Sequence, residues 1–298
     1  MKNKQKVNIK SVAIYCHYKP EKEKAERVFI REMIRFFHSQ GIKKIHGDAR
    51  TVNILHNSIP VVDDEKGYDL KIGIGGDGTL LKMIRTLQKK DGYLLGVNFG
   101  TLGFLSEFTP DNAIGNLHKI LAGEFHVDER MLVKSFVYRK NEAGKKQKVF
   151  RAYALNEVVF GHGGLARLTN FNLRVNRRFV TTYRSDGLIF ATPTGSTAYS
   201  MSAGGPIVYP SLETIVLTPV SPHTLTHRPI ALPAEKIFHL DFDSRSESIS
   251  MTADGQIYYS LKATDEVTIQ KATRTAKFIR MKESHYFKTL RNKLGWGS

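Results

Sequence analysis

The stretch from Lys71 to Leu81 limits what this chain can fold into more than any other part of the sequence. It reads KIGIGGDGTLL, an apolar run followed by three glycines around one carboxylate, Asp77. A helical pattern follows, with one face made of Leu80, Met83, Ile84 and Leu87. Glycine has no Cβ, and a helix N-terminus offers free backbone N–H donors and the positive end of a dipole. The stretch therefore predicts a strand, a phosphate-binding turn at Gly75, Gly76 and Gly78, and a helix start.

Two common phosphate-binding motifs match this turn poorly. Gly73, Gly75 and Gly78 fit the dinucleotide-binding fingerprint, but that motif needs an acidic residue about 20 residues later, at the end of the next strand. The next predicted strand ends in Asn98 instead. A Walker-type loop is excluded because no glycine-spaced Gly-Lys-Ser or Gly-Lys-Thr occurs.

Asp77 is the unusual residue of the turn, because a carboxylate repels a phosphate group. Its charge is useful there if it performs chemistry or holds a metal ion. The alternative is an aspartate that only caps the following helix, and the two interpretations have about equal weight from the turn alone.

The first 123 residues alternate between predicted strands and helices. Apolar runs predict strands over residues 11–16, 69–74 and 93–97, with a further short strand within residues 42–54. Residues 21–40 predict an amphipathic helix with Ala25, Val28, Phe29, Met33, Phe36 and Phe37 on its apolar stripe, and residues 111–121 predict another helix. This order indicates a Rossmann-like parallel sheet with the glycine turn at its carboxyl end, where such sheets bind ligands.

Residues 124–272 show a different sequence pattern, in which short β-rich segments are separated by glycine, asparagine and proline turns. The segments are 131–138, 149–160, 170–175, 179–183, 188–192 and 237–242. This pattern predicts an all-β, sandwich-like domain. Residues 273–298 are basic and aromatic, and we expect them to pack back on the first domain. The predicted fold class is therefore a two-domain α+β protein.

Two polar stretches interrupt the β-rich half. Asn156 and Glu157 lie inside the apolar run ALNEVVF, where unpaired polar side chains would be costly to bury. They either bond to backbone at a strand end or contact ligand hydroxyls. Residues 192–206 are rich in hydroxyl and small side chains, with Tyr199 as a stacking surface, which favours a ligand loop for adenine, ribose and phosphate over a plain turn.

Composition narrows the class of protein. The 298 residues, of which 41% are hydrophobic, suffice for one large or two ordinary domains with buried cores. The single cysteine, Cys16, excludes a disulfide framework and a multi-cysteine zinc site, and predicts a reducing cytoplasm. The N-terminal apolar run is too short for a signal peptide or a membrane span, so no membrane partner is expected. The net charge of +17 fits nucleic acid, a membrane face or polyanionic small ligands.

Several motifs together resemble one enzyme family. Residues 75–79 resemble the Gly-Gly-Asp-Gly-Thr signature that NAD kinases share with diacylglycerol and sphingosine kinases and, more distantly, with phosphofructokinases. The stretches 98–105, 156–157, 186–187, 192–199, 204–206, 217–229 and 254–256 are similar, in the same order, to motifs of the NAD kinases alone. The resemblance covers roughly residues 70–260.

The resemblance implies transfer of the γ-phosphoryl group of ATP to the 2′-hydroxyl of the adenosine ribose of NAD. It implies Asp77 as the proton acceptor, Gly75, Gly76 and Gly78 as the phosphate-facing turn, and Asn156 and Glu157 as the ribose contacts. It further implies binding contacts at Lys82, Arg167, Arg184, Asp186, Thr197, Ala198, Tyr199, Ser200, Met201, Ser202 and Gln256. The evidence for Lys82 and Arg167 is spacing alone.

The family also implies a divalent metal, Mg²⁺ or Mn²⁺, that arrives with ATP, since no carboxylate cage for it is visible in the sequence. A homodimer or homotetramer is expected, and nucleic acid is an unlikely partner. Three alternatives remain: a lipid kinase that shares the Gly-Gly-Asp-Gly-Thr signature, a non-catalytic nucleotide-binding regulator, and a nucleic-acid-binding module that uses the positive charge.

Overall fold

The computed structural model describes residues 8–17, 20–87, 90–162, 169–224, 226–243, 249–281 and 286–295. The chain divides into two compact units, which we treat separately. Unit 1 comprises residues 1–129 and 276–298, and unit 2 comprises residues 130–275. The predicted boundaries fell after residues 123 and 272. The two-domain α+β class is confirmed by the sheets described below.

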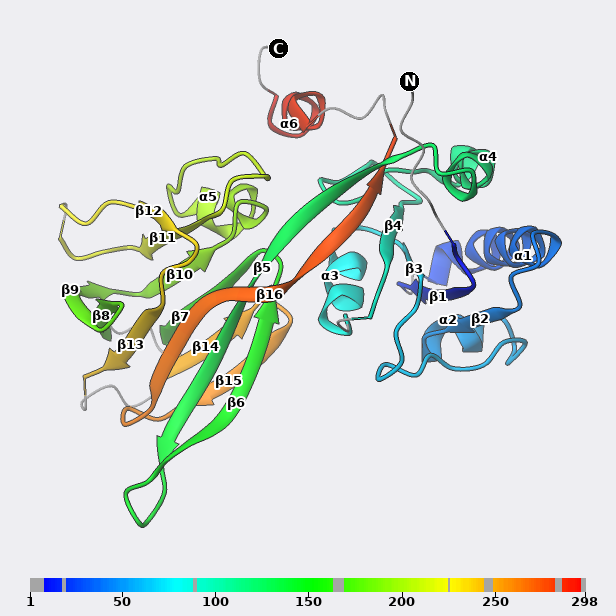
Figure 1. The fold of residues 1–298 in the computed structure, drawn as a ribbon. Coiled ribbons are helices and arrows are strands. Elements are labelled where there is room, and N and C mark those ends of the chain that lie inside the picture. The colour runs from blue at the N-terminus through cyan, green and yellow to red at the C-terminus, as the bar shows by residue number, and fades with distance from the viewer. Residues whose placement is uncertain are drawn as a thin grey trace. The chain divides into compact units, whose positions relative to one another are not determined.

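Unit 1 is built on parallel strands with helices between them (Figure 1). Its elements are β1 (Ser11–Cys16), the 3-10 turn η1 (Pro20–Lys22), α1 (Glu23–Ser39), β2 (Lys44–Gly47), α2 (Ala49–Ile54), β3 (Leu70–Ile74), α3 (Asp77–Arg85), β4 (Tyr93–Val97), α4 (Pro110–Leu121) and α6 (Tyr286–Leu294). The strand order is β2-β1-β3-β4. After β1 the chain adds β2 on one side, and it then returns to add β3 and β4 on the other side, so the order of the strands reverses between β1 and β3. Open α/β sheets bind ligands at the carboxyl ends of strands beside such a reversal, and the glycine turn follows β3.

The parallel strands form because they are apolar on both faces, as a sheet covered by helices requires. Every residue of β1 and β3 is buried, including one charged side chain, Lys71. The Lys71 ammonium lies 2.7 Å from the Asp91 carboxylate and also donates to the Thr86 carbonyl at 3.1 Å. The buried charge is thus paired and hydrogen-bonded.

The apolar stripe of α1 differs in part from the predicted stripe. Phe29 and Ile30 are buried, whereas Val28 is 62% exposed. Successive helical residues are about 100° apart, so the core-facing stripe centred between Phe29 and Met33 turns Val28 towards solvent. The assignment of Val28 to the core was therefore wrong.

Unit 2 contains two antiparallel arrangements of strands around one apolar core. Its elements are β5 (His126–Lys140), β6 (Lys146–Ala154), β7 (Glu157–His162), β8 (Thr169–Val175), β9 (Arg178–Ser185), β10 (Gly187–Ala191), η2 (Gly195–Thr197), α5 (Tyr199–Ser202), β11 (Thr214–Val220), β12 (Ile230–Pro233), β13 (Phe238–Phe242), β14 (Ile249–Ala253), β15 (Ile257–Leu261) and β16 (Glu266–Arg280). One sheet has the order β12-β11-β10-β7-β14-β15. The other contains β16-β13-β8-β9, with β5 paired to β16 and to β6. The sandwich-like prediction is confirmed.

Two details of the β-rich half were not predicted. The single segment 149–160 is two strands, β6 and β7, which are separated by Leu155 and Asn156. The residues from 266 to 280 form one long strand, β16, whose C-terminal end enters unit 1 and pairs in parallel with β4 at Phe278 and Leu94 (Figure 1). The expected return of the C-terminal residues to the first domain is confirmed.

No helix in the described part of the chain combines the length and the apolar composition that crossing a membrane would need.

Candidate active site

The glycine turn joins β3 to α3 in a conformation that requires glycine. Gly75 has φ of +144°, and a Cβ added there would lie 2.4 Å from the Thr79 hydroxyl oxygen. Its N–H donates to the Val97 carbonyl at 2.8 Å, which ties the turn to β4. A Cβ at Gly76 would meet no heavy atom within 4 Å, so this residue faces open space at the start of α3. The turn therefore presents backbone at a helix N-terminus, as predicted for an anion site.

Asp77 is the first residue of α3, and backbone groups hold its carboxylate. The Phe104 N–H donates to Oδ2 at 2.9 Å, and the Leu105 N–H donates to Oδ1 at 3.3 Å. A Cβ added to Gly103 would lie 2.1 Å from Asp77 Oδ1, so the backbone of this loop packs directly against the carboxylate. Two N–H donors and the positive end of α3 stabilise the negative charge, and the half-buried side chain has a fixed direction.

Internal hydrogen bonds shape the loop that holds Asp77. The Asn98 amide nitrogen donates to the Thr101 carbonyl at 2.7 Å, and the Asn98 amide oxygen accepts from the Gly100 N–H at 2.9 Å. The Gly103 N–H donates to the Ser106 hydroxyl at 2.7 Å. The two bonds of its side-chain amide explain the asparagine at position 98, and the close approach of the Asp77 carboxylate explains the glycine at position 103.

Lys82 lies one turn and a half further along α3. Its half-exposed ammonium is 3.2 Å from the Asp48 carboxylate, which also caps the N-terminus of α2 by accepting from the Thr51 N–H at 2.9 Å. The predicted ligand contact thus has a protein partner in this structure, and its role towards a ligand stays a prediction.

Glu157 begins β7 in unit 2, and its carboxyl group is buried. One oxygen, Oε2, has no hydrogen-bond partner among the described residues, while the Tyr199 N–H donates to the carboxyl group. Burial, followed by the nearby charge of Asp254, raises the pKa of Glu157 to about 8 from the ordinary value of 4.5. The group is therefore mostly protonated at neutral pH and can donate one hydrogen bond.

Asp254 was not among the predicted site residues, yet it fixes the backbone there. Its carboxylate accepts from the N–H groups of Leu155 at 2.9 Å, Asn156 at 2.7 Å and Glu157 at 3.2 Å. Asp254 has φ of +50° in a tight turn before Gly255, and an Asp-Gly pair in such a turn is the signal that could have found it. Gln256 follows on the same turn with an exposed side chain.

The hydroxyl-rich stretch wraps around Asn156. A Cβ added to Gly195 would lie 2.1 Å from the Asn156 carbonyl oxygen, and the Thr192 N–H donates to the same oxygen at 2.8 Å. The Ser196 hydroxyl donates to the Pro193 carbonyl at 2.6 Å.

Not every hydroxyl or small side chain of this stretch faces solvent. Ser200 lies 2.9 Å from the Thr218 hydroxyl and is buried. By contrast, Tyr199 is 45% exposed, and Thr197, Ala198, Met201 and Ser202 are half-buried or exposed. Among the predicted contacts from Thr197 to Ser202, Ser200 is therefore a buried, structural hydroxyl, whereas Tyr199 presents an accessible aromatic ring.

Arg184 and Asp186 are exposed and lie at the other end of β10. In the β7–β10 register, Gly187 faces Gly161 and Ala191 faces Glu157. Four residues of strand, at about 3.3 Å each, separate the two ends by about 13 Å. Arg184 and Asp186, which the resemblance implied as binding contacts near the nicotinamide end of NAD, are thus not brought beside the predicted ribose contacts. Arg167 lies outside the described residues.

Comparisons with known proteins identify the family. The model of the ATP-NAD kinase N-terminal domain matches residues 8–125, and that of the ATP-NAD kinase C-terminal domain matches residues 155–281. The chain belongs to the ATP-NAD kinase family. A NAD kinase of Syntrophotalea carbinolica is 40% identical over 275 residues, which cover 90% of this chain and 93% of that protein.

Two solved members of the family have the same fold. A yeast NADH kinase, complexed with NADH, aligns with a TM-score of 0.86 at 24% identity and covers 98% of this chain and 89% of its own. An NAD kinase from Archaeoglobus fulgidus, in complex with ATP, aligns with a TM-score of 0.72 at 24% identity. The alignment covers 96% of this chain and 98% of the Archaeoglobus chain. The resemblance to NAD kinases is confirmed, and family membership favours this phosphotransferase over the lipid-kinase alternative.

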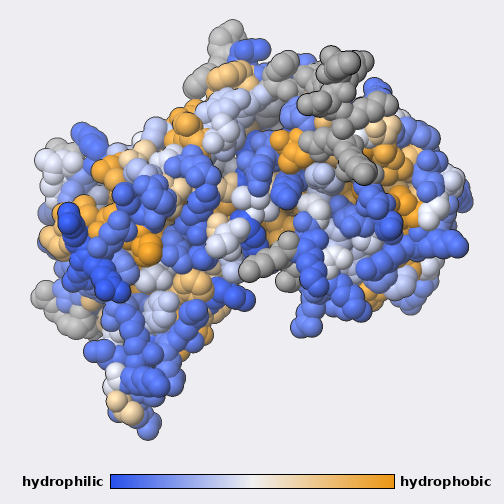
Figure 2. Space-filling view, viewed as in Figure 1, coloured by the Kyte–Doolittle hydropathy of each residue, from blue (hydrophilic) through white to orange (hydrophobic). Residues whose placement is uncertain are grey.

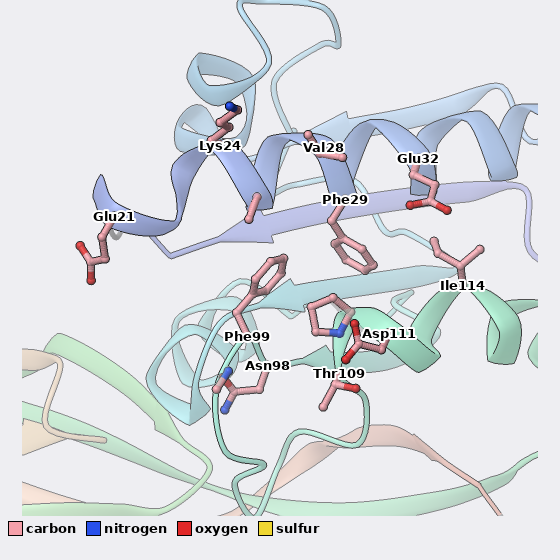
Figure 3. Close-up of a pocket in the computed structure, with 13 residues that line it drawn as sticks. Glu21, Lys24, Val28, Phe29, Glu32, Asn98, Phe99, Thr109, Asp111 and Ile114 are labelled. Atoms are coloured by element: carbon pink, nitrogen blue, oxygen red, sulfur yellow. The ribbon is translucent and has the colours of Figure 1, made fainter.

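A groove of about 930 Å³ opens in unit 1 between α1, α4 and residues 98–100, the first part of the loop that holds Asp77 (Figure 3). Phe29 and Phe99 point towards each other across it, with ring centroids 5.6 Å apart. Three carboxylates and one ammonium also line it, from Glu21, Glu32, Asp111 and Lys24. The surplus of negative charge disfavours a triphosphate, so we do not place the phosphates of ATP in this groove.

The described residues contain no group of three or more histidine, cysteine, aspartate and glutamate side chains that could hold a metal ion. Cys16 is buried, and burial with the nearby Glu26 raises the pKa of its thiol. A buried thiol with a raised pKa is a poor nucleophile and a poor metal ligand.

Part of the positive charge lies on the β5–β6 hairpin, where hydrophilic residues cover most of the face seen in Figure 2. Several of these cations rest on aromatic rings of the same unit. On the hairpin, the Lys148 ammonium is 4.1 Å from the Phe136 ring centroid. From β16, which pairs with β5, the Arg274 guanidinium lies 3.7 Å from the ring centroid of Tyr153 on β6. Rings covered in this way are poor stacking surfaces for nucleic-acid bases, which weakens the nucleic-acid alternative.

Proposed function

We propose that this protein transfers the γ-phosphoryl group of ATP to the 2′-hydroxyl of the adenosine ribose of NAD, giving NADP, with Asp77 as the group that accepts the hydroxyl proton. The observation that carries this assignment is the carboxylate of Asp77, fixed by the N–H groups of Phe104 and Leu105 beside a glycine turn at a helix N-terminus. A base and a phosphate-binding backbone thus lie side by side.

The role of Asp77 follows from the chemistry of phosphoryl transfer. A carboxylate is a far weaker base than an alkoxide, so Asp77 orients the hydroxyl in the ground state and takes its proton late. A loose transition state needs little deprotonation of the nucleophile at an early stage. General-base help of this kind contributes on the order of 10²- to 10⁴-fold, and alignment of the reactants and neutralisation of charge contribute the rest.

Unit 2 supplies the proposed contacts to NAD. The unpaired Oε2 of Glu157, in a carboxyl group with a pKa of about 8, suits a hydrogen bond to a ribose hydroxyl. The exposed ring of Tyr199 suits stacking on adenine. Arg184 and Asp186, at the far end of β10, suit the opposite end of an extended dinucleotide.

A divalent metal fits this chain only as an ion carried by the nucleotide. Asp77 is the one carboxylate of the glycine turn, its two oxygens each accept a backbone hydrogen bond, and a single carboxylate does not form a cage for the ion. Mg²⁺ characteristically keeps several waters and binds through substrate phosphates, where it neutralises their charge.

Self-association into a dimer or tetramer is also proposed. Tyr258 on β15 and Phe179 on β9 are each 62% exposed, and both strands lie at the edge of a sheet. Exposed aromatic side chains on edge strands favour contacts between copies. Light scattering coupled to size-exclusion chromatography measures the number of subunits directly.

The decisive experiment is NADP formation from NAD and Mg-ATP by the purified protein, beside the variant Asp77→Asn. We expect the variant to lose about 10²-fold or more in kcat, the scale of a lost general base. NADP formation that survives unchanged in Asp77→Asn would remove Asp77 from the mechanism. Absence of NADP from the wild type, with diacylglycerol or a sphingoid base phosphorylated instead, would restore the lipid-kinase alternative.

A further inference from the structure

Arg280, the last residue of β16, contacts the backbone of the loop that holds Asp77. It is buried in unit 1, and the register of Phe278 with Leu94 places it alongside the carboxyl-terminal part of β4 (Figure 1). The sequence gave no sign of a role for it, because the last 35 residues carry no recognisable motif. Its environment nevertheless connects it to the proposed base.

The guanidinium of Arg280 makes three separate hydrogen bonds. Nη2 donates to the Phe104 carbonyl at 2.8 Å, Nη1 donates to Glu107 Oε2 at 3.0 Å, and Nε donates to Asp128 Oδ2 at 3.2 Å. The second oxygen of Glu107 accepts from the Met281 N–H at 3.2 Å. Glu107 and Asp128 therefore hold the guanidinium in place, and its remaining branch is directed at the Phe104 carbonyl.

The Phe104 carbonyl and the Leu105 N–H belong to one peptide unit. In a trans peptide these two groups point in opposite directions, so fixing one fixes the other. The carbonyl accepts from Arg280, and the N–H donates to Asp77 Oδ1 at 3.3 Å. A cation on the carbonyl side also polarises the peptide, which strengthens the N–H as a donor.

We propose that Arg280 is a positioning residue for phosphoryl transfer, acting on Asp77 through the Phe104–Leu105 peptide. This proposal rests on the proposed function of Asp77. With Arg280 in place, the peptide N–H faces the carboxylate and limits its rotamers. Without it, this peptide is no longer held from the carbonyl side, and Asp77 loses one of the two N–H bonds that give it the direction required for alignment with the ribose hydroxyl.

The test uses Arg280→Lys in the full chain. Lysine keeps the charge, but it lacks the planar fork that reaches three acceptors at once. We expect kcat to fall about tenfold or more, while KM for NAD stays within about twofold, because NAD contacts lie on other residues. Arg139→Lys is the matched control, since Arg139 makes a bidentate pair with buried Asp265 in unit 2, with both N–O distances at 2.7 Å. This control should lower the unfolding midpoint and leave kcat unchanged.

A double-mutant cycle separates positioning from general destabilisation. If Arg280 acts through Asp77, adding Arg280→Lys to Asp77→Asn should cause no further loss of kcat, because the group that it positions is already absent. A further tenfold loss in the double variant, or an equal loss of kcat in Arg139→Lys, would overturn the proposal. An unchanged kcat in Asp77→Asn alone would instead contradict the proposed function, so the two failures are distinguishable.

Discussion

Asp77 in unit 1 and Glu157 in unit 2 are acidic side chains with opposite surroundings. Asp77 is half-buried at a helix N-terminus and accepts two backbone N–H groups, which fix the direction of its side chain. Glu157 is buried close to Asp254, one of its oxygens has no hydrogen-bond partner within the described part of the chain, and its pKa is raised to about 8. The same functional group is thus prepared for two tasks, accepting a proton in one unit and donating a hydrogen bond in the other.

The largest expected effect comes from moving Asp77 without changing it. In Gly103→Ala, the new Cβ would lie 2.1 Å from Asp77 Oδ1, so the carboxylate must shift. We expect kcat to fall about 10²-fold or more, close to the loss in Asp77→Asn, because the base is misaligned. Gly115→Ala in α4 is the control, since its Cβ would meet no heavy atom within 4 Å. If steady-state assays show Gly103→Ala and Gly115→Ala to be equally active, the fixed direction of Asp77 does not matter.

A second prediction concerns the buried ion pair of unit 1, in which the Lys71 ammonium is paired with the Asp91 carboxylate. In Lys71→Met, the Asp91 carboxylate, whose side chain is 2% exposed, loses its ammonium partner. We expect a loss of about 3 kcal/mol in the free energy of unfolding, the usual result of removing one member of a buried pair. Urea unfolding measures it. The exposed pair of Lys66 with Asp63 is the control, and Lys66→Met should leave the urea unfolding midpoint almost unchanged. Equal losses in both variants would show that burial does not strengthen the Lys71 pair.

The pKa of Glu157 gives a prediction about stability and pH. The folded protein keeps this proton up to about pH 8, whereas the unfolded chain releases it near the ordinary value of 4.5. Between these values the folded state binds more protons, so the contribution of Glu157 to stability falls as pH rises.

Glu157→Gln should remove the loss of stability with rising pH, because glutamine carries no titrating proton. Between pH 5 and pH 9, the free energy of unfolding of the variant should rise relative to that of the wild type by at least about 1.4 kcal/mol, the value of one pKa unit. Thermal unfolding across this range checks it, with the exposed Glu235→Gln as a control that should show no such trend. A difference between wild type and Glu157→Gln that is independent of pH would mean that Glu157 is ionised like an ordinary glutamate.

The smallest effect is expected at Lys82, whose ammonium is half-exposed beside Asp48. If it contacts a phosphate of ATP, Lys82→Met should raise KM for ATP about threefold, because solvent screens an exposed charge pair to less than about 1 kcal/mol. Initial rates at varied ATP measure this. An unchanged KM, with only a small change in stability, would assign Lys82 to its pair with Asp48 alone.

Local pattern was enough to find the main parts of the fold. The strands β1, β3 and β4 were predicted to within about one residue because buried parallel strands are continuous apolar runs, whereas the short β2 was placed only within residues 42–54. The glycine turn was predicted because only glycine readily adopts its backbone conformation. The strands β11, β12, β14, β15 and β16 were not predicted. Their stabilisation comes from pairing and packing with distant strands, which a local pattern does not contain.

The sequence by itself determined the family, the two-domain class and the identity of Asp77 as the notable acid, since these depend on residue types at short spacing. Only the tertiary structure decided what surrounds each acid. Asp254 reaches residues 155–157 across about 100 positions of the chain, and Arg280 reaches Phe104 across 176. Burial and hydrogen bonding between residues so far apart arise from folding, and they set the direction of Asp77 and the protonation of Glu157.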